Sequence, residues 1–223
     1  MRCARRSSAG ICFIGRRNFS SFLTQYIEPS PGAFVSVESG AEVGAHRGLE
    51  LYTNGQKARI SGASAPWFVA GKDRTSGTVY VAQGHDHPAL YSDTAVVGDF
   101  HWVAGAPPPP VQTAGFRGTF KARYLQRPGW CDLRVTQPSD LPPPSRFCLG
   151  GLCEPGQGGG VTADAPLSVR FDRPVRALTP HQALVLYDGD VCLGAGLLRH
   201  HGATVYEHGG TVPLSTVEAQ PGS

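Results

Sequence analysis

Apolar residues near the N-terminus follow a helical spacing. Counted from Asn18, they recur at intervals of three and four residues, at Phe19, Phe22, Leu23, Tyr26 and Ile27. This is the pattern of one face of an amphipathic helix, with Asn18 as a suitable N-cap. Two prolines and a glycine follow within 29–32 and would end the helix. The pattern therefore predicts a short helix over 18–27.

After Gly32 the pattern changes to short runs rich in β-branched and aromatic residues between turn residues, which is typical of strands. The runs are 34–37, 67–70, 78–82, 118–125, 131–135, 167–171, 183–187 and 191–194. Asp188-Gly189 is a hairpin turn between the last two. The sequence therefore predicts a mainly β fold, with a central β-rich domain over 31–98 and a small β-barrel of five or six strands over 99–213.

Three segments look like connections rather than core. Four prolines at 107–110 predict a stiff, extended spacer. The stretch 137–160 contains a triple proline and a triple glycine, and we interpret it as a flexible insertion in the barrel domain. The tail 214–223 is expected to be disordered.

Composition narrows the class of protein only a little. The 223 residues include 40% apolar residues, enough for a core, together with 29 glycines and 19 prolines, which favour turns. A net charge of +3 is compatible with a phosphate-bearing partner but does not require one. No run of 18 uncharged apolar residues occurs, so no membrane partner is predicted. Six scattered cysteines favour a reducing compartment over a disulfide scaffold.

Common catalytic motifs are missing from the sequence. It has no Gly-x-x-x-x-Gly-Lys-Ser/Thr loop, no Gly-x-Gly-x-x-Gly turn and no His-Glu-x-x-His helix. His85 and His87 would share one face of a strand, but no third ligand is near them, so no metal site is predicted. Cys148 and Cys153 have no second pair at zinc-site spacing and are interpreted as incidental loop cysteines.

Cys12 has two interpretations. A cysteine between Ile11 and Phe13 is usually a small buried apolar residue. Its surroundings also suit a reactive thiolate, because Gly10 and Gly15 allow close backbone approach and two arginines follow at 16–17. A thiolate of this kind can attack an electrophile or carry sulfur.

A second group of residues suits RNA. Lys121, Arg123, Tyr124 and Arg127 lie on or just after one predicted barrel strand, where cations can hold phosphates and an aromatic ring can stack on a base. A charged solvent face would look the same. Gln182, between two strands, could read a base or be an ordinary loop residue.

Taken in order, several motifs resemble the tRNA-specific 2-thiouridylases, and the stretch 66–73 looks more like the animal mitochondrial branch than the bacterial one. The resemblance covers about residues 8–212. The motifs are Gly10-Ile-Cys-Phe-Ile-Gly15, Arg17-Asn-Phe19, Tyr52-Thr53, Gly55-Gln56, Pro66-Trp67, Lys72-Asp73, Asp86-His-Pro-Ala-Leu-Tyr91, His101-Trp102, Arg123-Tyr124 and Tyr187-Asp-Gly-Asp-Val-Cys-Leu-Gly194.

The resemblance implies an activity and a set of site residues. Such enzymes use ATP to activate the wobble uridine of tRNA and replace its C2 oxygen with sulfur carried as a cysteine persulfide. Cys12 corresponds to the persulfide cysteine, while Arg123, Tyr124 and Gln182 correspond to tRNA contacts. The implied partners are tRNA and a sulfur-donor protein, and the implied location is the mitochondrion.

The resemblance also implies missing parts. The Ser-Gly-Gly-x-Asp-Ser ATP loop and the first catalytic cysteine are not found in the 223 residues. Residues 1–30 are therefore expected to be a remnant of an α/β PP-loop domain, although five arginines and no acid in the first 27 residues imitate a transit peptide. We expect the chain alone to be inactive, and a non-catalytic RNA-binding module is the alternative.

Three positions depart from the family pattern. Leu125 replaces a basic residue, His181 replaces a glycine before Gln182, and Lys57 replaces an arginine. Lysine lacks the planar fork of arginine. We expect these changes to alter tRNA affinity.

Overall fold

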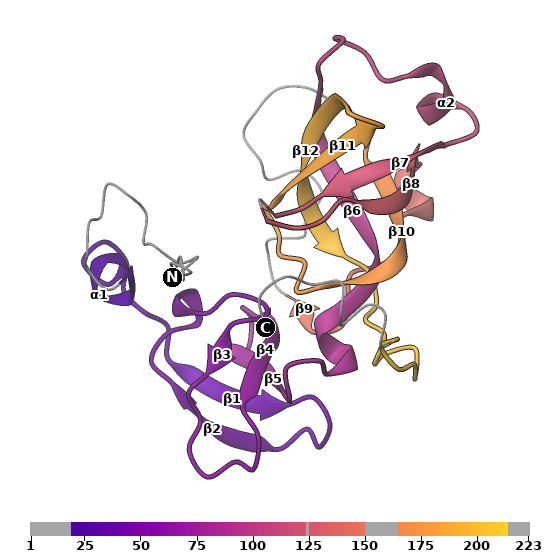
Figure 1. The fold of residues 1–223 in the computed structure, drawn as a ribbon. Coiled ribbons are helices and arrows are strands. Elements are labelled where there is room, and N and C mark those ends of the chain that lie inside the picture. The colour runs from indigo at the N-terminus through magenta and orange to yellow at the C-terminus, as the bar shows by residue number, and fades with distance from the viewer. Residues whose placement is uncertain (1–18, 124, 150–164, 214–223) are drawn as a thin grey trace, which may run out of the picture.

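A computed structural model describes residues 19–123, 125–149 and 165–213, and these residues form a mainly β structure, as the sequence predicted. Figure 1 shows an open, curled sheet beside a closed barrel, with a short helix, α1 (Phe19–Leu23), before the sheet. Cys12 and Tyr124 lie outside the described residues.

The curled sheet has the strand order β2-β1-β5-β4-β3. Neighbouring strands are antiparallel except β1 and β5, which run parallel, and β9, which adds to β4 in parallel. The strands are β1 (Gly32–Ser36), β2 (Glu42–His46), β3 (Lys57–Ala58), β4 (Trp67–Asp73), β5 (Thr78–Gln83) and β9 (Cys148–Leu149).

The barrel closes in the order β10-β6-β12-β11-β7-β8, with β8 returning to β10. Every neighbouring pair is antiparallel. The strands are β6 (Tyr91–Trp102), β7 (Phe116–Lys121), β8 (Gly129–Val135), β10 (Leu167–Arg176), β11 (Ala183–Asp188) and β12 (Val191–His201). The small barrel predicted from strand spacing is thus confirmed with six strands.

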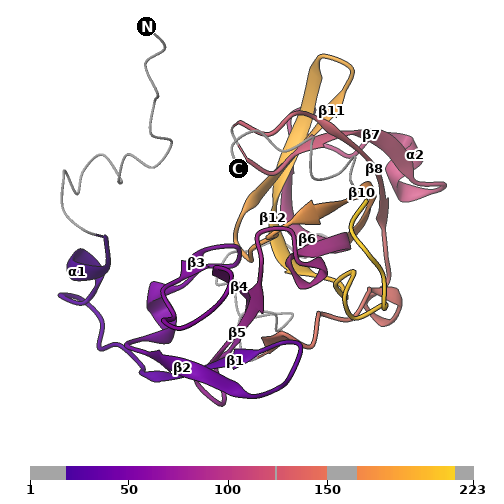
Figure 2. The ribbon, with the colours of Figure 1, turned by 60° about the horizontal axis from the view of Figure 1, so that its bottom comes forward.

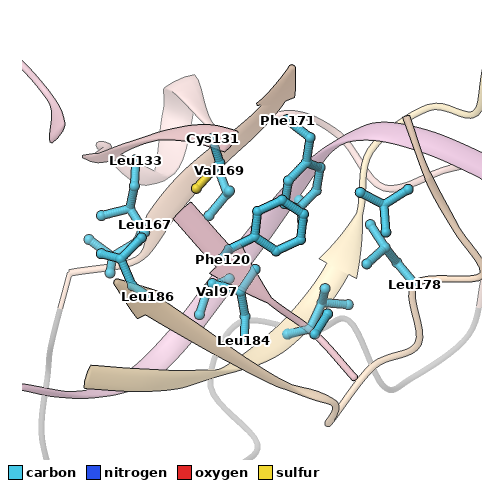
Figure 3. Close-up of a cluster of buried hydrophobic side chains, with 14 of the residues drawn as sticks. Val97, Phe120, Cys131, Leu133, Leu167, Val169, Phe171, Leu178, Leu184 and Leu186 are labelled. Atoms are coloured by element: carbon cyan, nitrogen blue, oxygen red, sulfur yellow. The ribbon is translucent and has the colours of Figure 1, made fainter. Parts of the chain in front are cut away.

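Alternation of side chains fills the barrel. In β8, Cys131 and Leu133 are fully buried while their neighbours face solvent, which is the period-two pattern of a strand with one apolar face. Phe120 and Phe171 pack with their ring centroids 4.5 Å apart near the centre of the cluster (Figure 3). The barrel interior is therefore a packed core rather than a channel.

The sheet and the barrel are joined through backbone and side-chain hydrogen bonds. The N–H of Ala177, just after β10, donates to the carbonyl of Leu90 at 2.7 Å. The amide of Asn54 donates to the carbonyl of Leu178 at 3.1 Å. Figure 2 shows the loop before β6 and the end of β10 meeting at this junction. The short 3-10 helices η1 (Leu49–Leu51) and η2 (Pro88–Leu90) lie on the sheet side.

The proline run is not the extended spacer that the sequence predicted. Pro109 and Pro110 begin a short helix, α2 (Pro109–Gln112), since the first turn of a helix needs no N–H bond and the proline ring presets a helical φ. The turn places Val111 in the barrel core, where it is 1% exposed. Burial of this apolar side chain explains the helix, and the sequence pattern alone did not show it.

The stretch 137–160 is also not wholly a solvent loop. After the 3-10 helix η3 (Pro138–Asp140), Ser145 and Phe147 are buried and β9 pairs with the sheet. The prediction of a polar insertion is wrong for this part, because one aromatic residue finds an apolar partner surface far away in sequence. Residues 150–160 lie outside the described residues.

Two boundaries differ from the expected ones. The helix predicted over 18–27 is α-helical for Phe19–Leu23 and continues as turns, and the Phe22 and Tyr26 rings contact with centroids 5.0 Å apart. Strand β6 begins at Tyr91, so the expected domain boundary at 98 falls inside a barrel strand. No helix in the described ranges is long and apolar enough to cross a membrane.

Candidate functional site

Arg123 lies where β7 leads into the β7–β8 connection, and its side chain turns back toward the junction. Its Nη2 donates to the carbonyl of Arg176 at 2.5 Å and to that of Ala177 at 2.8 Å. The two carbonyls belong to the end of β10 and the residue after it. Arg123 therefore ties the connection that follows β7 to the segment that leaves β10.

The junction concentrates positive charge. Arg123 as a residue is exposed, but burial of its guanidinium, and secondarily the nearby Arg176 charge, lower its pKa. Arg176 is only 8% exposed, and burial likewise lowers its pKa against the opposing effects of Tyr91 and Asp86. Neither arginine forms an ion pair with a carboxylate of the described residues. An anion approaching this junction would be attracted by both charges.

Arg176 was not singled out by the sequence analysis, although it lies at the centre of the junction. Its Nε donates to the carbonyl of His85 at 3.1 Å, and its guanidinium lies over the Phe68 ring at 5.4 Å. Its Nη2 is buried and has no hydrogen-bond partner among the described residues. No local pattern marks Arg176, because its neighbours come from the sheet.

Gln182 follows a tight turn between β10 and β11. The N–H of Gln182 bonds the carbonyl of Thr179 at 3.2 Å, Pro180 follows Thr179, and His181 has φ of 66°. A positive φ at the third residue is the signature of a type II turn, which glycine adopts most easily. This explains in physical terms why a glycine would suit position 181.

The side chain of Gln182 is oriented by one hydrogen bond. Its Nε2 donates to the carbonyl of Ala122 at 2.6 Å, whereas its Oε1 is buried and without a partner among the described residues. Since Ala122 precedes Arg123 directly, Gln182 contacts the backbone next to Arg123 although 60 residues separate Ala122 from Gln182. The Arg123 side chain itself bonds the carbonyls of Arg176 and Ala177.

His85 and His87, which the sequence analysis considered as metal ligands, interact with neighbouring side chains and backbone groups. His85 Nδ1 lies 2.8 Å from Asp86 Oδ1, and Tyr91 donates to that same oxygen at 2.9 Å. His87 accepts from the N–H of Ala89, and its Nε2 lies 3.1 Å from Glu38 Oε1. Among the residues that the structure describes, no three potential metal ligands come together.

The described cysteines differ in environment. Cys131 is inside the barrel, and burial raises the pKa of its thiol to about 12, so it stays protonated at neutral pH. Cys148 is half-buried in β9, and Cys192 is exposed on β12. Cys153 lies outside the described residues, as does Cys12.

Comparison with known families places two matches along the chain. Residues 20–83, which include most of the curled sheet, match the tRNA methyl transferase PRC-barrel domain. Residues 160–198, at the end of the barrel, match the aminomethyltransferase beta-barrel domain. The fold and these matches define a two-part β module, a curled sheet followed by a barrel.

Comparison with individual proteins gives more specific matches. The chain is 39% identical over 211 residues to the tRNA-specific 2-thiouridylase MnmA of Protochlamydia amoebophila, covering 94% of this chain and 48% of the relative. Identities are 41% over 201 residues with MnmA of Burkholderia cenocepacia and 42% over 202 residues with that of Paraburkholderia xenovorans. These cover 87% and 88% of the chain and 46% and 45% of the relatives.

The chain thus spans about half the length of the curated relatives it matches. Over most of its own length it is similar to the tRNA-specific 2-thiouridylases, and both domain matches support a relationship with that family.

Proposed function

We propose that this chain provides the tRNA-binding parts of an ATP-dependent tRNA 2-sulfurtransferase, which replaces the C2 oxygen of the wobble uridine of mitochondrial tRNAs with sulfur. The observation that carries the proposal is the position of two residues at the junction: Arg123 donates to the carbonyls of Arg176 and Ala177, and Gln182 donates to the carbonyl of Ala122, the residue before Arg123. The identities near 40% to proteins named tRNA-specific 2-thiouridylase support it.

The geometry suits RNA for two reasons. The Arg123 guanidinium is held by two carbonyls, and its positive charge remains available to a phosphate oxygen. Gln182 is held through its Nε2, and its Oε1 is buried without a partner among the described residues. A base N–H or a ribose 2′-hydroxyl would donate to this oxygen once RNA binding exposes it. Arg123 would position the RNA backbone, and Gln182 would contact a nucleotide directly.

Two parts of the proposal lie outside the described residues. Tyr124 is proposed as a tRNA contact next to Arg123, and Cys12 as the carrier of persulfide sulfur received from a donor protein. The sequence holds no Ser-Gly-Gly-x-Asp-Ser loop, so we do not place the ATP-dependent step in these 223 residues. The chain by itself is expected to bind tRNA without thiolating it.

A binding titration with unmodified mitochondrial tRNA tests the proposal. We expect Arg123→Ala and Gln182→Ala each to weaken binding about tenfold, because each removes one charge-assisted or buried polar contact. Arg199→Ala removes an arginine engaged by Asp99 on another part of the barrel and serves as the matched control. A folded wild-type chain that does not bind tRNA would refute the proposal.

A non-catalytic RNA-binding module is the second candidate. It is favoured by the presence of both RNA-contact residues in a sequence that lacks the ATP loop. Incubation with a cysteine desulfurase and cysteine, followed by mass analysis of the Cys12 peptide, separates the two. A persulfide on Cys12 supports the sulfurtransferase, whereas tRNA binding without persulfide supports the module.

A further inference from the structure

We propose that the exposed ring of Trp130 stacks on an unpaired nucleobase of bound RNA, while Lys121 and Arg127 hold the adjoining phosphates. This inference rests on the proposed function and adds a contact on the outer wall of the barrel. It concerns different side chains from the Arg123 and Gln182 site.

Trp130 lies on the outer face of the barrel. It is 54% exposed, while its neighbour Cys131 points inward and is fully buried. Trp130 is paired with Thr119 on β7, and Thr119 is paired with Tyr187 on β11, so these three residues form one row on the same face. Figure 1 shows β7 and β8 side by side in the barrel wall. The exposed indole offers an aromatic face on which an unpaired base can stack.

The indole ring already has a cation on one side. The Arg117 guanidinium lies over it at 5.4 Å from the centroid. Arg117 is in turn held by Asp172 at 2.6 Å and by Asp132 at 3.2 Å. This contact restrains the ring. Along β7, Arg117 precedes Thr119, the partner of Trp130, so Arg117 lies on the side of Trp130 that is away from the β7–β8 connection.

The charged residues around Trp130 indicate which kind of ligand would bind there. The segment 121–130 contains Lys121, Arg123 and Arg127 and no acidic residue. Lys121 and Arg127 form no ion pair within the described part of the chain. The nearby acids Asp132 and Asp172 lie on the other side of Trp130, with Arg117. A ring beside unpaired cations fits a nucleobase and its phosphates, because stacking accepts any base and the cations neutralise the backbone.

Affinity measurements with three ligands test the inference: unmodified tRNA, a short uridine oligonucleotide, and the same oligonucleotide with abasic residues. We expect Trp130→Ala to weaken binding of tRNA and of the uridine oligonucleotide by about 5- to 100-fold, as for loss of one stacked base. Binding of the abasic strand should change less than twofold, and the salt dependence should stay the same. Trp130→Phe should retain most of the affinity.

Two further variants make the test specific. Lys121→Ala should weaken binding of all three ligands. It should also reduce the slope of log affinity against log salt by about 0.7, the value for one phosphate contact on a single strand. Val191→Ala, which trims another exposed apolar side chain of the barrel, is the matched control and should bind as wild type does. Trp130→Thr replaces Trp130→Ala if the alanine variant does not fold, since threonine suits an exposed strand position.

The outcomes separate this inference from the proposed function. If wild type binds tRNA and Arg123→Ala weakens it, but Trp130→Ala or Trp130→Thr binds as wild type does, the stacking contact is refuted and the proposed function stands. Equal losses for the uridine and abasic strands would also refute it, because the effect would not depend on a base. If wild type binds no tRNA, the proposed function fails, and stacking is then refuted unless the uridine oligonucleotide still binds through Trp130.

Discussion

The barrel and the curled sheet bury their apolar residues in different ways. Each barrel strand has two neighbours, and the buried residues inside form one cluster. The sheet is open, and its buried residues fall into two clusters. One of these clusters is completed by Phe147, Val205 and Tyr206, which lie outside the main path of the sheet.

The difference indicates which part stabilises the other. The barrel closes its own hydrogen-bond ladder and so can carry polar loops at its rim without losing its core. The sheet needs two segments that are far apart in the sequence to cover one face, and Glu207 joins those segments by accepting from Ser145 and Thr204. Stability should therefore be concentrated in the barrel, and the sheet should depend on its covering segments.

The largest effect is expected from the barrel centre. Phe120→Ala removes a ring that is 2% exposed and packed on Phe171, and we expect it to lower the free energy of unfolding by about 4 kcal/mol. Urea unfolding followed by circular dichroism measures the loss. Phe116→Ala, at a partly buried position of the same strand, should cost clearly less. Equal losses would show that the barrel has no dominant centre.

A smaller and more local loss of stability is expected when Phe147, which covers one face of the sheet, is truncated. Phe147→Ala removes a side chain that is 5% exposed and packs near Tyr80, at a cost of about 3 kcal/mol. Hydrogen exchange should speed up in β4 and β5 and remain slow in β7 and β8. Arg146→Ala, which removes the cation over the Phe147 ring and its 3.9 Å ion pair with Glu207 but keeps the Phe147 ring, is the control. Faster exchange throughout the barrel would contradict the separation of the two parts.

The link at Glu207 adds a dependence on pH. Burial acts to raise the pKa of Glu207, but hydrogen bonds from Thr204, Ser145 and Arg146 outweigh it and lower the pKa below 4.5. A lowered carboxyl pKa stabilises the folded state above the unfolded value and loses this contribution as pH falls through the folded value. Glu207→Gln should therefore cost about 2 kcal/mol at pH 7.

The free energies of unfolding of wild type and Glu207→Gln should become similar as the pH falls below about 4.5. Burial lowers the pKa of the neighbouring His201, so His201 also destabilises both proteins in acid. The Glu207 charge acts to raise the pKa of His201, so the difference between wild type and Glu207→Gln also contains the interaction between these two groups. A difference that does not change with pH would show that the Glu207 charge is not involved.

The smallest effect is a gain at the barrel rim. His181 has φ of 66°, where a side chain is strained and glycine is not, so His181→Gly should stabilise the protein by about 1 kcal/mol. Thermal unfolding measures the change, and Gln182 should keep its place after the turn. His208→Gly, at an exposed position away from this turn, should not stabilise. A loss of stability in His181→Gly would mean that the histidine ring makes a compensating contact.

The strands were largely predictable because the evidence for them is local. The alternation at 131–135 identified β8, and Asp188-Gly189 identified the turn between β11 and β12. The errors arose where burial depends on distant residues. Val111 turned the proline run into a helix, and Phe147 drew a polar stretch onto the sheet.

The candidate site was predictable only through resemblance. Residue types alone left Arg123 and Gln182 as ordinary charged and loop residues, and Arg176 had no signal at all. Tertiary structure brought Gln182 to the carbonyl of Ala122, next to Arg123, and buried Arg176 between sheet and barrel. Their roles in binding tRNA stay predictions that the variants above test.

Local sequence patterns were sufficient to predict the mainly β character, the approximate strands and the small barrel, since period-two alternation and turn residues act over a few neighbouring positions. They did not predict how the barrel closes, which segments cover the sheet or which polar groups come together at the junction. Those outcomes depend on contacts between residues far apart in the chain, such as the hydrogen bond from Gln182 to Ala122, and no local pattern encodes them.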